Sequence, residues 1–287
     1  MRYITFDQIA RAIESLAQRV AHELPGDVIA ALETAADNES SPPAKDILNQ
    51  LLENSRLARQ ELIPLCQDTG LVVVFIEQGR EICFENNADN PDWILDDAVN
   101  AGVAAGYEKG YLRKSIVAEP LDKRRNTQTN TPAVIHHSFV TGDKLKITLM
   151  AKGGGCENKS RFKMFKPTAD KEQVIKWIVD VVEQAGADAC PPFVVGIGLG
   201  GDFELSCLLS KKALLRKLNQ PNSEKFYADM EKQLLTKINS LGLGPQGLGG
   251  DTTALAAAIE TAPCHIASLP VAVNIECHSH RHKTAVL

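Results

Sequence analysis

The first 60 residues arrange apolar and polar positions with the period of amphipathic helices. Behind a candidate helix cap at Thr5, apolar side chains recur every three or four positions, at Phe6, Ile9, Ile13, Leu16 and Val20. Gly26 can open a second helix, and Pro42 can open a third. We therefore predict a helical front end over residues 1–60.

From residue 64 onward, short apolar runs alternate with longer amphipathic segments. The apolar runs predict strands at residues 71–77, 133–140, 144–151, 193–201 and 269–275. The amphipathic segments predict helices at residues 92–109, 170–187, 203–216 and 222–239. This alternation predicts the α/β class: a helical N-terminal region followed by mixed sheets flanked by helices. No internal repeat or low-complexity linker divides the sequence, so we expect a single domain over residues 1–287.

Turn signals of two kinds lie between these elements. Thr141, Gly142 and Asp143 join two predicted strands and indicate a β-hairpin. Residues 152–160 (KGGGCENKS) and 241–254 (LGLGPQGLGGDTTA) are too rich in glycine for regular structure. Such loops either expose backbone N–H groups to a carboxylate or phosphate, or are structural turns. Neither matches the Walker sequence, so a nucleotide site is the weaker interpretation.

Charge and composition narrow the class of protein. Of the 287 residues, 44% are hydrophobic, and the formal net charge is −5, which gives no electrostatic reason to bind nucleic acid. No apolar run approaches the roughly 20 residues that span a bilayer, and the N-terminal segment lacks the apolar core of a signal peptide. We expect a cytoplasmic protein with reduced thiols and no membrane partner.

The seven cysteines, at irregular spacing, favour metal binding or catalysis over disulfides. Cys66 and Cys190 each precede an expected strand, and Cys277 follows one. Element ends are where ligands are usually presented, so these three are the candidate metal ligands. Cys83 and Cys207 lie inside a predicted strand and a predicted helix, where packing is the favoured role.

The spacing of the cysteines does not by itself fix a metal. No CxxC pair is present, so zinc-ribbon and ferredoxin patterns are absent. Three isolated thiols suit an iron–sulfur cluster with one open iron, whereas a structural zinc site needs four closed ligands. A non-catalytic iron–sulfur or zinc-binding regulatory module is the alternative of another class. The stretch 261–282, with two cysteines and four histidines, is either part of a metal site or a packed and solvated chain end.

Charged side chains near the glycine-rich loops suit a small dicarboxylate. The candidate cations are Arg113, Arg124, Arg125, Lys152 and Lys159, with surface charge as the alternative. Asp68, two residues after Cys66, could donate a proton near the metal or cap the following segment.

Five segments in order resemble the class I (iron–sulfur) fumarate hydratase family. They are PLCQDTG, KGGGCENKS, ACPPFVVGIGLGG, GLGPQGLGGDTTALA and PCHIASLPVAVNIECHSHRH. More closely, they look like the alpha subunit of its two-subunit form, which is related to the alpha subunit of L-tartrate dehydratase. The resemblance covers about residues 5–285.

The resemblance implies a [4Fe-4S] cluster whose ligands are Cys66, Cys190 and Cys277. It implies substrate contacts at Gln67, Asp68, Arg113, Gly155 and His265. Asp68 and His265 are then the candidate catalytic residues, which would manage the proton of the departing hydroxyl. Relatives often have Ser where this chain has Cys156, so Cys156 is not expected to be a ligand. Cys264 is expected to pack, and His278, His280 and His282 to lie at the surface or an interface.

The resemblance also implies a reaction and a partner. We expect reversible hydration of fumarate to L-malate, a step of the tricarboxylic acid cycle, with the open iron as Lewis acid. L-Tartrate dehydration is the alternative, and the fumarase-like ENKS after GGGC favours fumarate. Single-chain relatives continue into a C-terminal domain that supplies the base, whereas this chain ends at Leu287. We therefore expect a separate beta subunit, and a homodimer of alpha chains within an alpha2beta2 assembly.

Overall fold

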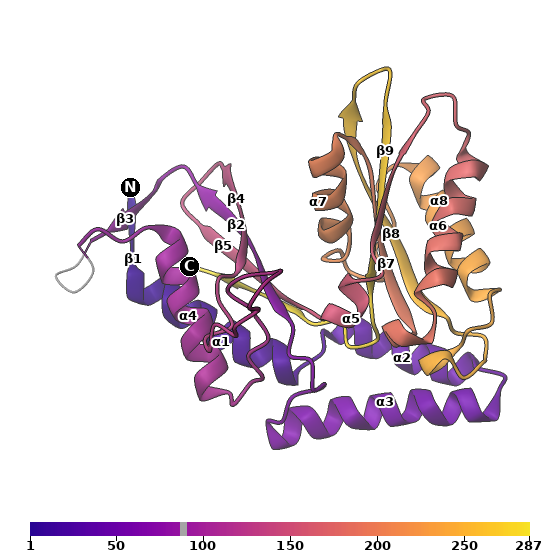
Figure 1. Cartoon of the computed structure of the whole chain (residues 1–287), viewed down its shortest axis with the longest axis horizontal. Helices are drawn as coiled ribbons and strands as arrows, with labels where there is room; N and C mark the ends of the chain where they lie inside the picture. The colour runs from indigo at the N-terminus through magenta and orange to yellow at the C-terminus, as the bar shows by residue number, and fades with distance from the viewer. Residues whose placement is uncertain (87–90) are drawn as a thin grey trace. The chain divides into compact units, whose positions relative to one another are not determined.

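The computed structural model describes residues 1–86 and 91–287 (Figure 1). Contacts group the chain into two compact units, described separately below. Unit 1 comprises Met1–Pro25, Ser55–Gly154 and Arg281–Leu287, and unit 2 comprises Gly26–Asn54 and Gly155–His280. Helices and mixed sheets occur in the chain, which confirms the predicted α/β class. The single domain over residues 1–287 stays a prediction.

Unit 1 is built on a four-stranded mixed sheet in the order β10-β5-β2-β4. Its strands are β2 (Leu71–Gly79), β4 (Val134–Val140), β5 (Leu145–Lys152) and β10 (His282–Val286), and its helices are α1 (Phe6–His22) and α4 (Leu95–Lys109). Alternate residues of β2 are buried in a core shared with α1 and α4, as the period of a strand requires. A separate parallel pair is formed by β1 (Arg2–Thr5) and β3 (Ile82–Glu85).

Local sequence explains how α1 starts and how closely α4 packs on it. Thr5 caps α1 in a capping box: Gln8 N–H donates to Thr5 Oγ1 (3.3 Å), and Thr5 N–H donates to Gln8 Oε1 (2.9 Å). The predicted cap is therefore confirmed. On α4, Gly102 and Gly106 face α1, and a Cβ at Gly102 would lie 2.4 Å from the Ala10 carbonyl oxygen. The small residues thus let the two helices approach each other.

The predicted hairpin at residues 141–143 is wrong. β4 and β5 are both present, but β2 lies between them, parallel to β4 and antiparallel to β5. The turn instead passes over the end of β2, where a Cβ on Gly79 would lie 2.4 Å from the Gly142 carbonyl oxygen. A turn signal says that the chain reverses there, but not that the two strands become neighbours.

Unit 2 is built on a second four-stranded sheet in the order β6-β9-β7-β8. Its strands are β6 (Arg161–Phe165), β7 (Phe193–Gly201), β8 (Ala254–Cys264) and β9 (Leu269–Glu276). The helices that pack on the sheet are α6 (Lys171–Ala185), α7 (Phe203–Ala213) and α8 (Lys225–Asn239). In Figure 1, α7 covers one face, and α6 and α8 cover the other.

The other helices among the described residues connect or flank these elements. They are α2 (Gly26–Asn38), α3 (Pro42–Glu61), α5 (Gly154–Glu157), η1 (Ala187–Ala189) and η2 (Pro245–Gly247). α1, α2 and α3 confirm the predicted helical front end. The division between the units falls inside α3 and inside α5. No helix among the described residues has the length and apolar content needed to cross a membrane.

The two sheets share one pairing scheme, although the sequence shows no repeat. In each sheet one of the two central strands, β2 or β7, is parallel to one neighbour and antiparallel to the other. The whole unit 2 sheet lies in the chain between two strands of unit 1: after β5 the chain enters β6 of unit 2, and after β9 it enters β10 of unit 1. The two crossing segments, residues 153–160 and 277–281, contain Cys156 and Cys277.

Strands β1, β6, β8 and β10 are not among the predicted elements. β8 (ALAAAIETAPC) is dominated by alanine, a residue with low strand preference, so its sequence carries little strand signal. β6 and β10 are five residues long each, and neither is a continuous apolar run of the kind from which the other strands are predicted.

Gly196 and Gly198 of β7 set the distance between the sheet and α7. A Cβ at Gly198 would lie 2.0 Å from the Ser206 carbonyl oxygen, and one at Gly196 would lie 2.1 Å from the Ser210 carbonyl oxygen. We expect Gly198→Ala to lower the free energy of unfolding by about 3 kcal/mol, because the helix must move away from the strand. The measurement is urea unfolding followed by circular dichroism.

The matched control is Gly26→Ala, where an added Cβ meets nothing within 4 Å. This variant should leave the unfolding midpoint nearly unchanged. Equal stability of Gly198→Ala and the parent would contradict the close packing of α7 on β7.

Candidate functional site

The turn that contains Cys66 is held by a carboxylate and by main-chain bonds within unit 1. The preceding residue, Leu65, donates its N–H to the Ala21 carbonyl oxygen (2.8 Å). Asp68 accepts the Gly70 N–H at Oδ1 (3.0 Å) and the Gly154 N–H at Oδ2 (2.7 Å). Asp68 therefore ties the turn to the start of the glycine-rich segment after β5. It acts as a local cap, and each oxygen keeps a further lone pair for a ligand.

Two buried polar side chains form hydrogen bonds with the main chain of this turn. Tyr107, 1% exposed, has its hydroxyl 2.8 Å from the Thr69 carbonyl oxygen and 3.0 Å from that of Gly70. Asn130, fully buried, donates from Nδ2 to the same Gly70 oxygen (3.1 Å). Burial raises the pKa of Tyr107 well above its usual range, the positive charge of Arg281 opposes this, and the negative charge of Asp68 adds to it. Tyr107 is therefore a neutral donor.

The turn also contains Gln67 and contacts the main chain of Arg113. Gln67 Oε1 accepts a hydrogen bond from the Cys66 thiol (3.3 Å). The Thr69 hydroxyl donates to the Arg113 carbonyl oxygen (2.6 Å), and the Arg113 side chain is exposed. Unit 1 thus brings four predicted site residues to one place: Cys66, Gln67, Asp68 and Arg113.

In unit 2, Cys190 and Cys277 lie at neighbouring positions. Cys190 follows η1 and has a left-handed backbone (φ 56°). Its carbonyl oxygen accepts the N–H of His278, the residue after Cys277, at 3.3 Å. Two of the three predicted metal ligands are thereby brought together by the fold.

The loop of residues 241–254 supports Cys190 rather than forming an open anion site. Gln246 donates both its main-chain N–H (2.8 Å) and its side-chain Nε2 (2.9 Å) to the carbonyl oxygen of Pro191. Glu39, 6% exposed, accepts the N–H groups of Asp251 (2.9 Å) and Thr252 (3.1 Å). The backbone donors of this loop are largely used within the protein, so the structural-turn interpretation is the one that the contacts support.

Cys156 lies beside Cys277. Their sulfur atoms and a carboxylate oxygen of Glu276 all lie within 4.8 Å of one another. Cys156 and Glu276 are buried, and the Cys156 Sγ is 3.5 Å from Glu276 Oε1. Glu157, the residue after Cys156, accepts hydrogen bonds from Lys211 and from Asn274 Nδ2 (3.2 Å). The crossing segment that contains Cys156 is thus fixed to the end of β9.

Gly155 lies in α5, where packing does not require a glycine. An added Cβ would meet only the Asp188 carbonyl oxygen, at an ordinary 3.8 Å. Lys159 pairs with the Asp188 carboxylate (3.5 Å), and Lys152 is fully buried at the end of β5.

His265 lies at the other end of the unit 2 sheet from Cys190. The β7–β8 register pairs Gly201, the last residue of β7, with Cys264, whereas Cys190 precedes the first residue of that strand. The nine residues of β7 span about 30 Å, at about 3.3 Å per residue. Unit 2 therefore does not bring His265 to the Cys190–Cys277 position.

Two minor expectations are wrong. Cys264 is exposed and donates to the Ser268 carbonyl oxygen (3.4 Å), so it is not a packing residue. His280 is fully buried, with Nε2 2.8 Å from the Leu214 carbonyl oxygen, so it is not a surface residue. The neighbouring Arg281 is 1% exposed. Buried residues in a polar sequence such as HSHRH give no periodic signal.

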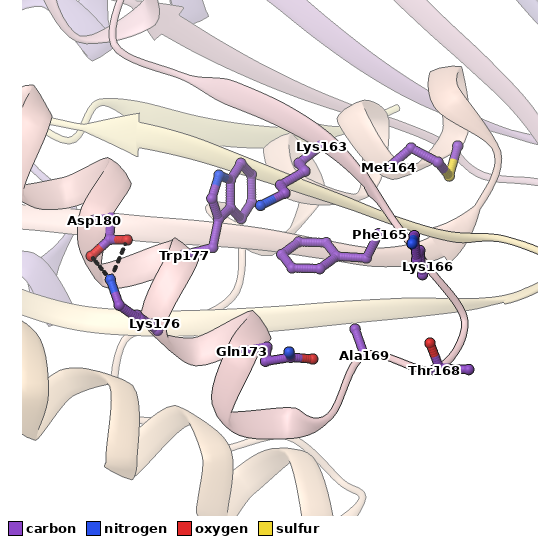
Figure 2. A pocket seen from close by; sticks show the side chains of 10 residues that line it. All are labelled: Lys163, Met164, Phe165, Lys166, Thr168, Ala169, Gln173, Lys176, Trp177 and Asp180. Atoms are coloured by element: carbon purple, nitrogen blue, oxygen red, sulfur yellow. Dashed lines mark hydrogen bonds and ion pairs between the residues drawn. The ribbon is translucent and has the colours of Figure 1, made fainter.

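A surface pocket of about 640 Å³ lies elsewhere, between β6 and α6 (Figure 2). Figure 2 shows Lys163 beside the rings of Phe165 and Trp177, with its amine 4.5 Å and 5.9 Å from the ring centroids. Lys176 pairs with Asp180 at 2.9 Å. None of the predicted site residues lines this pocket, so its size alone does not make it the candidate site.

Comparison with known proteins identifies the class as hydro-lyase. The model of the family described as fumarate hydratase (Fumerase) matches residues 10–286, and the chain belongs to this family. The chain is 40% identical over 278 residues to a Methanocaldococcus jannaschii protein provisionally named L(+)-tartrate dehydratase subunit alpha, covering 96% of this chain and 95% of that one. It is 29% identical over 280 residues to the L(+)-tartrate dehydratase subunit alpha of Escherichia coli UTI89, covering 97% and 90%. For the protein of the same name from strain K12 the identity is 28% over 283 residues, covering 98% and 91%.

Glu39 is the residue on which the loop behind Cys190 depends. We expect Glu39→Ala to lower the free energy of unfolding by about 2–4 kcal/mol, because buried N–H groups lose a charged acceptor. The Cys190 thiol should also react faster with an alkylating reagent, since its support is loosened. Urea unfolding and mass-spectrometric mapping of alkylated cysteines measure the two effects.

The control is Glu33→Ala, an exposed position of α2, the helix that ends at Asn38, immediately before Glu39. It should change neither the stability nor the rate of Cys190 alkylation. If Glu39→Ala behaves like this control, the loop does not support Cys190.

Proposed function

We propose that the chain is the alpha subunit of a hydro-lyase for four-carbon hydroxy-dicarboxylates, with a [4Fe-4S] cluster bound by Cys66, Cys190 and Cys277. The observation that carries the proposal is the meeting of Cys190 and Cys277 in unit 2, through the bond from His278 N–H to the Cys190 carbonyl oxygen (3.3 Å). Membership of the fumarate hydratase family over residues 10–286 supports the reaction class.

The donor set fits such a cluster. Three thiols at element ends, without a fourth cysteine in the same role, leave one iron open to substrate. When bound, the cluster supplies a Lewis acid that makes hydroxide a better leaving group. The Cys156 sulfur lies within 4.8 Å of the Cys277 sulfur and of a Glu276 carboxylate oxygen. In this proposal Cys156 therefore lines the cluster site but is not one of the three ligands.

The residues beside Cys66 bind and orient the substrate in this proposal. The Asp68 carboxylate, fixed by two N–H donors, accepts or returns the proton of the substrate hydroxyl. Gln67 and Arg113 contact substrate oxygens, with the Arg113 guanidinium as a carboxylate partner. The absence of a side chain at Gly155 leaves room for close approach of the substrate to the backbone.

His265 requires a second chain in this proposal. Since it lies about a strand length from Cys190 within unit 2, it contacts substrate only if another alpha chain supplies it. This agrees with the expected homodimer of alpha chains. The relatives are named as alpha subunits, which supports a separate beta subunit that completes the site and supplies the base.

Two substrates compete, each with its own support. The ENKS sequence after GGGC and the name of the family favour reversible hydration of fumarate to L-malate. The names of the relatives favour dehydration of L-tartrate. The reverse of fumarate hydration and the dehydration of L-tartrate both remove water from a 2-hydroxy-dicarboxylate, so the same site residues serve either.

The test is anaerobic reconstitution of the alpha chain with iron and sulfide, followed by addition of the beta subunit. We expect a brown protein that hydrates fumarate or dehydrates L-tartrate, and the ratio of the two kcat/KM values selects the substrate. Cys277→Ser should lose both colour and activity, because a cluster ligand is missing. Iron and sulfide analysis accompanies the rate measurements.

Cys83→Ser is the matched control, since Cys83 lies within β3 and is not one of the proposed ligands. It should keep both cluster and activity. A fully active enzyme without iron would refute the proposal, and a stable cluster without either activity would favour the regulatory module instead.

A further inference from the structure

Arg281 is a buried cation without a partner among the described residues. It lies immediately before β10 and is 1% exposed. Its Nε and Nη1 atoms are buried and have no hydrogen-bond partner in the described part of the chain. A buried charge is costly unless it is paired, so a lone guanidinium in this position indicates a missing anion.

Strand register places Arg281 at the same end of the unit 1 sheet as the Cys66 turn. The Arg281 carbonyl oxygen accepts the Ala151 N–H (3.1 Å), and the next residue of β5, Lys152, pairs with Leu71 at the start of β2. The turn that ends at Gly70 packs on this same point, because a Cβ on Gly70 would lie 2.9 Å from the Ala151 carbonyl carbon.

The electrostatic effects of Arg281 and Asp68 on Tyr107 agree with a position of Arg281 close to the Cys66 turn. The Tyr107 hydroxyl contacts the carbonyl oxygens of Thr69 and Gly70 in the turn. Arg281 lowers the pKa of this phenol and Asp68 raises it, against the larger rise due to burial. The charges of Arg281 and Asp68 therefore both act on the Tyr107 hydroxyl, which contacts the turn.

No ion pair to Arg281 is present among the described residues. Asp68, the carboxylate of the turn, accepts the Gly70 N–H at Oδ1 and the Gly154 N–H at Oδ2 and makes no hydrogen bond to the Arg281 Nε or Nη1. Tyr107 is uncharged. A ligand that brings its own carboxylate would supply the missing anion, and guanidinium is the side chain best suited to bind one.

We propose that Arg281 is a substrate-binding residue that holds one carboxylate of the dicarboxylate beside the Cys66–Asp68 turn. This inference rests on the proposed function, because it names a further binding residue of the same site. It also gives a reason for discrimination: a substrate with a single carboxylate would leave the buried guanidinium unpaired.

The test compares inhibitors of the reconstituted complex of alpha and beta chains. Succinate has two carboxylates and cannot react, and propionate has one. In Arg281→Met, we expect the succinate Ki and the substrate KM to rise at least about tenfold, bringing the succinate Ki toward that of propionate. Iron and sulfide content should stay at the level of the parent enzyme, which separates substrate binding from cluster loss.

If Arg281→Met does not fold, Arg281→Lys provides a second test, because it keeps the positive charge. Loss of the planar guanidinium, which can donate two hydrogen bonds to one carboxylate, should still raise the succinate Ki about threefold or more. Arg11→Met, which removes an exposed arginine of α1, is the matched control and should leave Ki and KM unchanged.

Unchanged succinate Ki and substrate KM in a folded, cluster-loaded Arg281→Met, or an unchanged Ki in Arg281→Lys, would overturn the inference. The two proposals fail in different ways. A parent enzyme that turns over substrate while the Arg281 variants match it overturns only the role of Arg281. A parent that turns over neither substrate and binds no succinate by calorimetry overturns both.

Discussion

Insertion of the whole unit 2 sheet between two strands of the unit 1 sheet is the constraint on which the rest of the structure depends. The unit 1 sheet is completed by β10, which the chain reaches only after it has formed β6 to β9 of unit 2. The crossing segments must therefore run past the sheet ends, and they contain Cys156, Cys277 and Arg281. The positions of these three residues are fixed because strands lie on either side of each crossing segment.

Much of the fold could be predicted from periodicity, and the failures have physical causes. α1, α6 and β2 follow directly from their apolar patterns and caps. The hairpin failed because β2 inserts between β4 and β5, a long-range pairing that no local turn signal contains. β8 was missed because its strand is stabilised by burial between neighbours rather than by its own alanines.

The candidate site shows the same division between local and long-range information. Cys66, Cys190 and Cys277 could be selected because element ends are visible in the sequence. Tyr107, Asn130 and Glu39 could not, because each supports a loop far away in the sequence, and nothing local marks that role. Arg281 was hidden in a polar run whose burial depends on the β5–β10 pairing.

The pairing of β10 with β5 has a consequence for how the protein is made. Leu287, which follows β10, exchanges both main-chain hydrogen bonds with Leu145 (3.0 Å and 2.9 Å). β2, β4 and β5 leave the ribosome long before β10, so one edge of their sheet waits, unpaired, while all of β6 to β9 is synthesised. A nascent chain of this protein therefore carries an open strand edge until β10 has emerged and can pair with β5.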